Sequence, residues 1–157
     1  MVYTKVVQIA TTRELEVIDI TQHVIDCVSE SEVEEGIINV FAKGSTCAIT
    51  TIEYEPGLLK DIGAILNRIS PDEDNFEYMH QKRWNDFNGH SHTRASILKP
   101  SLTVPIVDSK PVLGTWQQVV FVELDVRKRE REAILTVIGE KAQPCEEAPS
   151  GESAPEP

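Results

Sequence analysis

Short strand-like runs are the commonest predicted elements of this 157-residue sequence, and most connections between them are too short for the crossover that parallel strands require. The first two runs are separated by a few polar residues and predict a hairpin. The last two are rich in valine and isoleucine and give the strongest strand signal. The runs are residues 5–11, 14–21, 36–43, 47–54, 117–126 and 132–140.

Two helices are predicted between these runs. One follows Thr21, and the clearer one covers residues 58–69, where apolar side chains recur with a period of 3.6. Several strands with only two helices favour an α+β fold, with a mixed, mainly antiparallel β-sheet packed against helices. We assign residues 1–142 to this single domain. Residues 143–157 carry Pro, Glu, Ser and Ala without a large apolar side chain, so we predict a disordered acidic tail there.

The formal net charge of −11 argues against nucleic-acid binding, because phosphate contacts require a basic face. No apolar run approaches the roughly 18 residues of a membrane-spanning helix, and the start of the chain lacks the pattern of a signal peptide, so we expect no membrane contact. Three cysteines without paired spacing fit a reducing compartment. We therefore predict a cytoplasmic protein.

Residues 72–96 show no clean period and form the most informative part of the chain. The stretch 78–96, YMHQKRWNDFNGHSHTRAS, holds three of the four histidines together with acidic, amide and hydroxyl side chains. Loss of a packing pattern among many polar groups is typical of a functional site. The sequence therefore places the candidate site between His80 and His92.

Four polar side chains occupy every second position of this stretch, namely Asp86, Asn88, His90 and His92. In an extended segment they would share one face, and the two histidines would offer two imidazoles to one metal ion, with His80 as a third ligand. If a helix begins near Gly89 instead, the two histidines point in different directions and the shared-face argument fails.

Three uses of these imidazoles stay open. They can hold a divalent metal such as zinc or magnesium, or they can bind an anion together with Arg94 or Lys82. They can also merely form hydrogen bonds with the backbone and water. General acid–base catalysis is compatible with the first two uses, because imidazole titrates near neutral pH.

Other polar positions lie outside this segment. Ser45 and Thr46 occupy a turn between two strands, where amides and hydroxyls can hold an anion or merely satisfy the turn. Glu53 at a strand end and Asp61 on the next helix can face a pocket or be solvated. Cys47 is interpreted as a small buried strand residue rather than a nucleophile.

Taken together, these segments resemble the YjbQ-like family, also described as the secondary thiamine-phosphate synthase family. The resemblance extends from the first strands to about Gly139. It is carried by GxxxVFxxGSTCAITTxEYEPGLLKD at 36–61, DxNGHSH at 86–92 and VPIVDSKPVLGTWQQVVFVELD at 104–125.

The resemblance implies an α+β homotrimer with a polar pocket near the subunit interface. It also implies a weak thiamine-phosphate synthase activity, which joins a hydroxymethylpyrimidine diphosphate to a thiazole phosphate and releases pyrophosphate. Such a reaction needs a cradle for the leaving diphosphate, usually with a divalent ion. The implied catalytic residues are His80, His90, Glu53 and Asp61. The implied substrate-binding residues are Thr46, Asp86, Asn88, Thr115, Trp116 and Gln117. The metal-ligand candidates are His80, His90 and His92.

We therefore expect an enzyme that acts on a small phosphorylated or otherwise anionic metabolite through a histidine-rich pocket. One alternative is a trimeric module that binds a metal or an anion without catalysis. The other is a trimer in which the histidines join the subunits.

Overall fold

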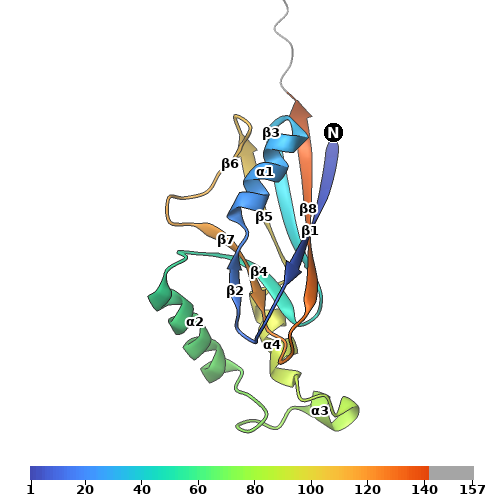
Figure 1. The fold of residues 1–157 in the computed structure, drawn as a ribbon, viewed down its shortest axis with the longest axis vertical. Helices are drawn as coiled ribbons and strands as arrows, with labels where there is room; N and C mark the ends of the chain where they lie inside the picture. The colour runs from blue at the N-terminus through green and yellow to red at the C-terminus, as the bar shows by residue number, and fades with distance from the viewer. Residues whose placement is uncertain (142–157) are drawn as a thin grey trace, which may run out of the picture.

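The computed structural model of the chain describes residues 1–141, which form eight strands and four helices (Figure 1). The strands are β1 (Val2–Ala10), β2 (Val17–Asp19), β3 (Val33–Lys43), β4 (Cys47–Ile52), β5 (Ser101–Val107), β6 (Lys110–Pro111), β7 (Gln118–Glu123) and β8 (Glu130–Lys141). The helices are α1 (Thr21–Ser31), α2 (Pro56–Ile69), α3 (Met79–Trp84) and α4 (Gly89–Leu98).

The strands form two antiparallel sheets, one of five strands in the order β1-β8-β3-β5-β6 and one of three in the order β2-β7-β4. Every strand pair within residues 1–141 is antiparallel. The predicted α+β class, with a mainly antiparallel sheet packed against helices, is confirmed. The predicted hairpin between the first two strands is wrong, because β1 pairs with β8 and β2 pairs with β7.

Strand β7 is covered on both faces. Val119 and Phe121 belong to the larger core cluster, together with residues of α1 and the five-stranded sheet. Val120 and Val122 belong to a second cluster, which includes Leu66 of α2 and Ala95 of α4. This double burial explains the continuous apolar run in the sequence, because neither face of the strand meets solvent.

The clearest helix predicted from the sequence, residues 58–69, is confirmed as α2. Pro56 occupies its first turn, and the carboxylate of Glu55 caps it by accepting from the amides of Gly57 and Leu58. The helix is only partly covered, since Ile65 and Ile69 are 52% and 55% exposed.

The patternless segment contains two short helices, α3 and α4. Helix α4 begins at Gly89, where a side chain would meet Tyr78, because a Cβ there would lie 2.6 Å from the Tyr78 Cβ. The amide of Gly89 donates to the carboxylate of Glu73 at 2.7 Å. The extended alternative for residues 86–92 is therefore wrong, and His90 and His92 point in different directions.

Among the helices of residues 1–141, none combines the length and apolar character needed to span a membrane. The predicted tail, residues 143–157, lies outside the residues that the structure describes.

Candidate functional site

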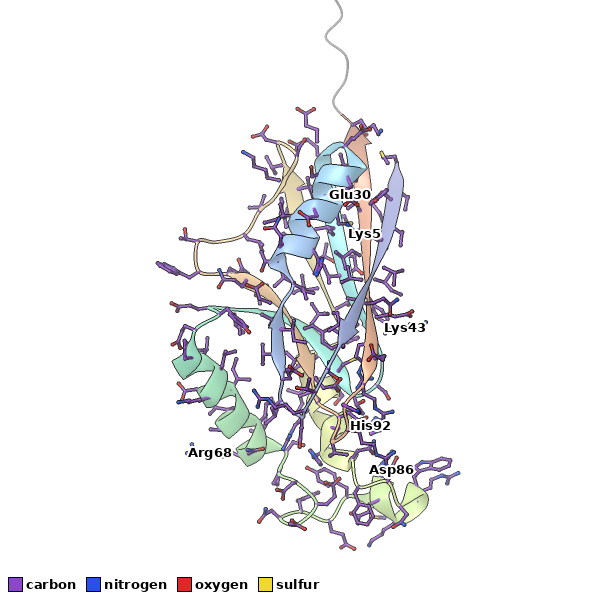
Figure 2. All side chains as sticks on the ribbon, in the orientation of Figure 1. Lys5, Glu30, Lys43, Arg68, Asp86 and His92 are labelled. Carbon is purple, nitrogen blue, oxygen red and sulfur yellow. The ribbon has the colours of Figure 1, made fainter. Side chains whose placement is uncertain are left out.

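The segment predicted to carry the site lies at the end of the molecule opposite the C-terminal end of β8, where α3 and α4 meet (Figure 2). Asp86 and His92 are labelled near one another at this end. His80 comes from α3, and Asp86 follows in the short connection between the two helices.

His80 and His92 form a close pair, which we call the histidine pair. Their ring centroids are 4.6 Å apart and the planes are tilted by 38°. Asp86 Oδ1 lies 3.2 Å from His80 Nδ1. The contact does not have the direction of a hydrogen bond, since this nitrogen is buried without a bonded partner within residues 1–141.

Asn88 supports this carboxylate from the other side. A carboxylate only accepts hydrogen bonds, so the amide nitrogen of Asn88 is the atom that belongs beside it. In that orientation the nitrogen lies 3.0 and 3.2 Å from the two oxygens of Asp86. Asn88 thus holds the Asp86 carboxylate, which lies beside the ring of His80.

His92 is electrostatically distinct. Burial lowers its pKa below the ordinary value, and the neighbouring ring of His80 acts in the same direction. The carboxylates of Asp86 and Asp125 and the backbone of Ser45 act against this shift without cancelling it. At neutral pH the imidazole of His92 is therefore neutral, with one nitrogen lone pair available for a proton or a ligand.

Thr46 lies behind this pair but faces a buried ion network. Its hydroxyl donates to Asp125 at 3.0 Å and accepts from Arg131 at 2.9 Å. Arg131 also makes two hydrogen bonds to the fully buried Glu123, at 2.6 and 2.8 Å. The predicted contact between Thr46 and a substrate is not available in this arrangement, because the hydroxyl is buried and already bonded.

His90 is separated from the pair and fully enclosed. Its Nδ1 lies 2.5 Å from Glu73 and its Nε2 lies 2.7 Å from Glu14. Burial opposes charge on this ring, but the hydrogen bond and charge of Glu14, together with the charge of Glu73, outweigh it and raise the pKa of His90. Arg94, one turn later, also pairs with Glu14, at 2.5 Å.

The predicted three-histidine metal site is consequently not formed. Both nitrogens of His90 are occupied by carboxylates, and only His80 and His92 lie together. Within residues 1–141, no group of three or more His, Cys, Asp or Glu side chains is arranged to hold a metal ion. The predicted use of Arg94 for an anion also fails, because the guanidinium is buried against Glu14 and Asn67.

A second group of predicted residues lies around the connection between β6 and β7. Glu53, Thr115 and Trp116 line a cavity of about 340 Å³, which we call the loop cavity. Trp116 is 71% exposed. Gln117 holds the loop instead of facing the cavity, since it accepts from the Gly114 amide and donates to Thr51 at 3.1 Å each. The other lining residues are Asp19, Tyr54, Glu55 and Gln118.

Strand β7 separates the two groups. Gln118 at its start lines the loop cavity, whereas Glu123 at its end joins the ion network behind the histidine pair. Six residues of a strand span about 17–20 Å. Asp61 joins neither group and lies exposed on α2.

Sequence reasoning missed Glu14 and Glu73 as the partners of His90, and it missed the inward-facing position of Arg94. The two glutamates lie far from His90 in the chain and resemble solvated charges, so no spacing rule identifies them. Arg94 and His90 are four residues apart and share a helix face, which gives the one usable signal once α4 is recognised.

The prediction that Cys47 is a small buried strand residue is confirmed. It is 1% exposed on β4, and burial raises the pKa of its thiol to about 11. A nucleophilic role would need the opposite shift.

Comparison with known proteins gives one consistent result. The family described as "UPF0047 protein YjbQ-like" matches residues 5–140. A UPF0047 protein of Methanothermobacter thermautotrophicus is 40% identical over 130 residues, which is 83% of this chain and 88% of that protein. A UPF0047 protein of Methanocaldococcus jannaschii is 36% identical over 135 residues, covering 85% and 93%.

Solved structures agree with the fold. A protein of unknown function from Sulfolobus solfataricus P2, described as YbjQ-like, superimposes with a TM-score of 0.83 at 33% identity, covering 89% of this chain and 99% of that one. A hypothetical protein from Aeropyrum pernix K1 gives a TM-score of 0.79 at 29% identity, covering 88% and 99%.

Proposed function

Because the chain belongs to the UPF0047 YjbQ-like family, we propose that it is an enzyme acting on a small phosphorylated or otherwise anionic metabolite at the histidine pair. The observation that carries the proposal is the contact between two imidazoles, 4.6 Å apart, beside the carboxylate of Asp86. A neutral His92 in contact with His80, which lies beside the Asp86 carboxylate, is an arrangement that suits proton transfer.

Each residue of the pair has a distinct part in this proposal. His92 accepts a proton, since its lowered pKa keeps the ring neutral at pH 7. His80 lies beside Asp86, whose carboxylate accepts hydrogen bonds from Asn88. His90, Glu14 and Glu73 position α4 and do not touch the substrate.

The family resemblance suggests the reaction to assay first, a thiamine-phosphate synthase-type transfer. Purified protein is given the hydroxymethylpyrimidine diphosphate and the thiazole phosphate, and pyrophosphate release is followed. We expect His92→Ala to lower the rate by about 10²–10⁴-fold, the usual share of general acid–base catalysis. His23→Ala serves as the control, because His23 is an exposed histidine on α1. Equal rates in His92→Ala and the wild type would exclude the pair from the mechanism.

We further propose that a homotrimer completes the site. Glu53 and Trp116 lie at the start of β7, and His92 lies near its other end, beside Cys47, which pairs with Glu123. The strand spans about 17–20 Å, too far for a small substrate to reach both groups within one chain. The exposed apolar side chains Ile65, Ile69, Phe76 and Trp84 give the chain surface to bury in such an assembly.

Mixing two inactive variants tests this shared site. His92→Ala and Glu53→Gln protomers are co-expressed with different tags, and the mixed trimers are isolated. If the two groups meet across subunits, some interfaces combine an intact His92 with an intact Glu53 and activity returns. A mixture as inactive as either parent contradicts the shared site but leaves the histidine pair untouched.

A second candidate is a metal- or anion-binding module without catalysis. The neutral imidazole of His92 favours it, because a metal ligand must offer a lone pair. A partner residue would have to supply further ligands. Elemental analysis of untagged protein, with zinc and magnesium titrations of wild type and His80→Ala, separates this candidate from the enzyme: stoichiometric metal without turnover favours it.

A further inference from the structure

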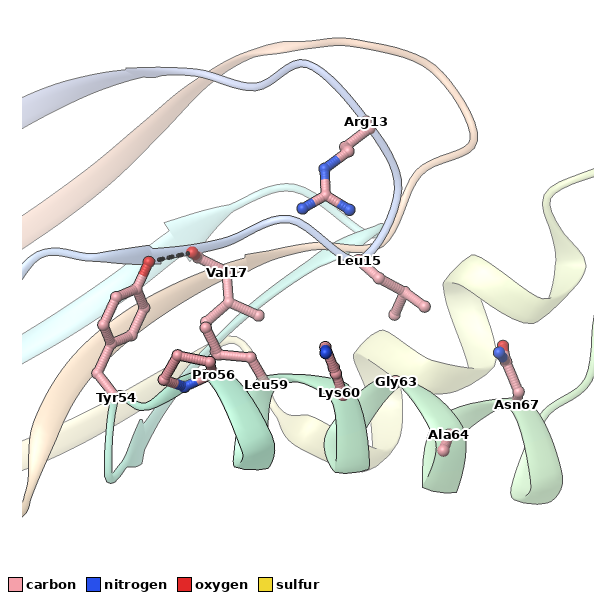
Figure 3. A pocket seen from close by; sticks show the side chains of 10 residues that line it. All are labelled: Arg13, Leu15, Val17, Tyr54, Pro56, Leu59, Lys60, Gly63, Ala64 and Asn67. Carbon is pink, nitrogen blue, oxygen red and sulfur yellow. Dashed lines mark hydrogen bonds between the residues drawn. The ribbon is translucent and has the colours of Figure 1, made fainter.

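A groove runs between helix α2 and the connection that follows β1, away from the histidine pair and adjoining the loop cavity at Tyr54 (Figure 3). Its volume is about 670 Å³, within the range of small-molecule sites. We call it the α2 groove. Its apolar lining comes from Leu15, Val17, Pro56, Leu59 and Ala64. Figure 3 shows α2 as one wall and the connection with β2 as the other.

Hydrogen bonds fix both walls. At one end, the hydroxyl of Tyr54 donates to the carbonyl of Val17 at 3.0 Å. At the other, the amide oxygen of Asn67 accepts from buried Arg94 at 2.8 Å. Arg94 also holds Glu14, which lies between the groove residues Arg13 and Leu15. The groove is therefore held open in advance, which reduces the entropy that a ligand would lose on binding.

The same contacts argue against a β-strand as the occupant. Strand addition requires free carbonyl and amide groups along the outer edge of β2. Tyr54 already occupies the carbonyl of Val17, at the point where such a strand would pair.

Charge identifies a better occupant. Arg13 lies on the connection after β1 and Lys60 lies on α2, and both line the groove (Figure 3). Neither belongs to an ion pair within residues 1–141. Both side chains are exposed, so each is free to pair with a ligand in the groove. The groove thus combines two basic side chains with an apolar lining.

We propose that the α2 groove binds a small amphipathic anion, with its acidic head between Arg13 and Lys60 and its apolar body on Leu15, Val17 and Leu59. This site is separate from the histidine pair and does not depend on the proposed reaction. The head can be a carboxylate, a sulfonate or a phosphate, because each pairs with both cations.

Three probes with the same apolar body test the proposal. Decanoate, decanol and decyltrimethylammonium are titrated into full-length protein by calorimetry, below their micelle concentrations and at low salt. We expect decanoate to bind one per chain, and decanol to bind at least about tenfold more weakly. We expect the cation not to bind. Similar affinities for the three probes would overturn the proposal.

Two changes in the groove complete the test. The double variant Arg13→Gln, Lys60→Gln should weaken the binding of decanoate about tenfold or more and leave the affinity for decanol unchanged. Ala64→Trp should fill the groove and weaken the binding of both decanoate and decanol. Because Ala64 is exposed on a helix, we expect the variant to fold, and circular dichroism checks this. Arg68→Gln is the matched control, since Arg68 lies on α2 but outside the lining.

A subunit contact is the competing explanation for this groove. If Ala64→Trp lowers the oligomer mass by light scattering, and wild-type protein binds no decanoate, the groove is an interface and the proposal fails. Decanoate binding that is lost in the double variant, at unchanged oligomer mass, supports it.

Discussion

The buried imidazole of His90 makes a specific prediction about stability and pH. Its two nitrogens face the carboxylates of Glu73 and Glu14, at 2.5 and 2.7 Å. Only the imidazolium carries an N–H on both nitrogens, so a neutral ring would turn one lone pair toward a carboxylate. His90→Gln removes the cation and leaves Glu73 without its charged partner, whereas Glu14 keeps Arg94.

The size of the effect follows from burial. His90 is 2% exposed and the side chain of Glu73 is 10% exposed, so this is a buried pair. Breaking such a pair by removing one partner costs about 3–5 kcal/mol in free energy of unfolding. That cost applies below about pH 6.5, where the ring is charged in both the folded and the unfolded chain.

The sign of the pH dependence follows from the raised pKa of His90. The stabilisation by the imidazolium is fully present below the unfolded pKa and is lost as the pH rises through the folded pKa. Between these two values the wild type should lose about 1.4 kcal/mol per pH unit relative to the variant. The lowered pKa of Glu14 acts on the acid side, where its contribution is lost as the pH falls below about 4.5.

Urea unfolding at fixed subunit concentration measures the difference between wild type and His90→Gln from pH 5.5 to pH 9. We expect the largest difference at pH 5.5 and a decrease toward pH 9. His23→Gln, at an exposed position on α1, should stay within about 0.5 kcal/mol of the wild type throughout. A difference between wild type and His90→Gln that does not change with pH would refute a charged ring between the two carboxylates.

Three further changes test the packing. Gly89→Ala should destabilise the fold by about 1–3 kcal/mol, because its Cβ would lie 2.6 Å from that of Tyr78, whereas Gly63→Ala, with its nearest contact at 3.6 Å, should be neutral or stabilising in thermal melts. Phe121→Ala should cost about 3–5 kcal/mol in urea unfolding, since the ring is fully buried in the larger core. Glu123→Gln should lower the melting temperature far more than Glu132→Gln, because Glu123 is the buried partner of Arg131 and Glu132 pairs with exposed Lys43.

The sequence predicted the fold class because apolar residues recur at regular spacings in its strands and in α2. It did not predict the pairing of β1, whose partner β8 lies more than 120 residues away. Strand pairing over such a distance leaves no local signal, whereas a short polar connection suggests a hairpin. Apolar and polar residues alternate along β1 and β8, which shows that one face of each strand is buried. The alternation does not show which strand lies beside it.

The candidate site was predicted in part for a related reason. His80, Asp86, Asn88 and His92 do converge. The choice between an extended segment and a helix beginning near Gly89 stayed open, because the buried face of α4 is mostly polar and a helical period is read from apolar residues. Asn88 before Gly89 favours a helix start by residue type alone. That helix separates His90 from His92.

The double burial of β7 ties the two ends of the molecule together during unfolding. Alternate side chains of this strand belong to different core clusters, so we expect that loss of order in one cluster weakens the other. The two clusters should therefore melt in a single cooperative transition, and a destabilising change beside Trp116 would reduce the folded population available to His92 just as one in α4 would.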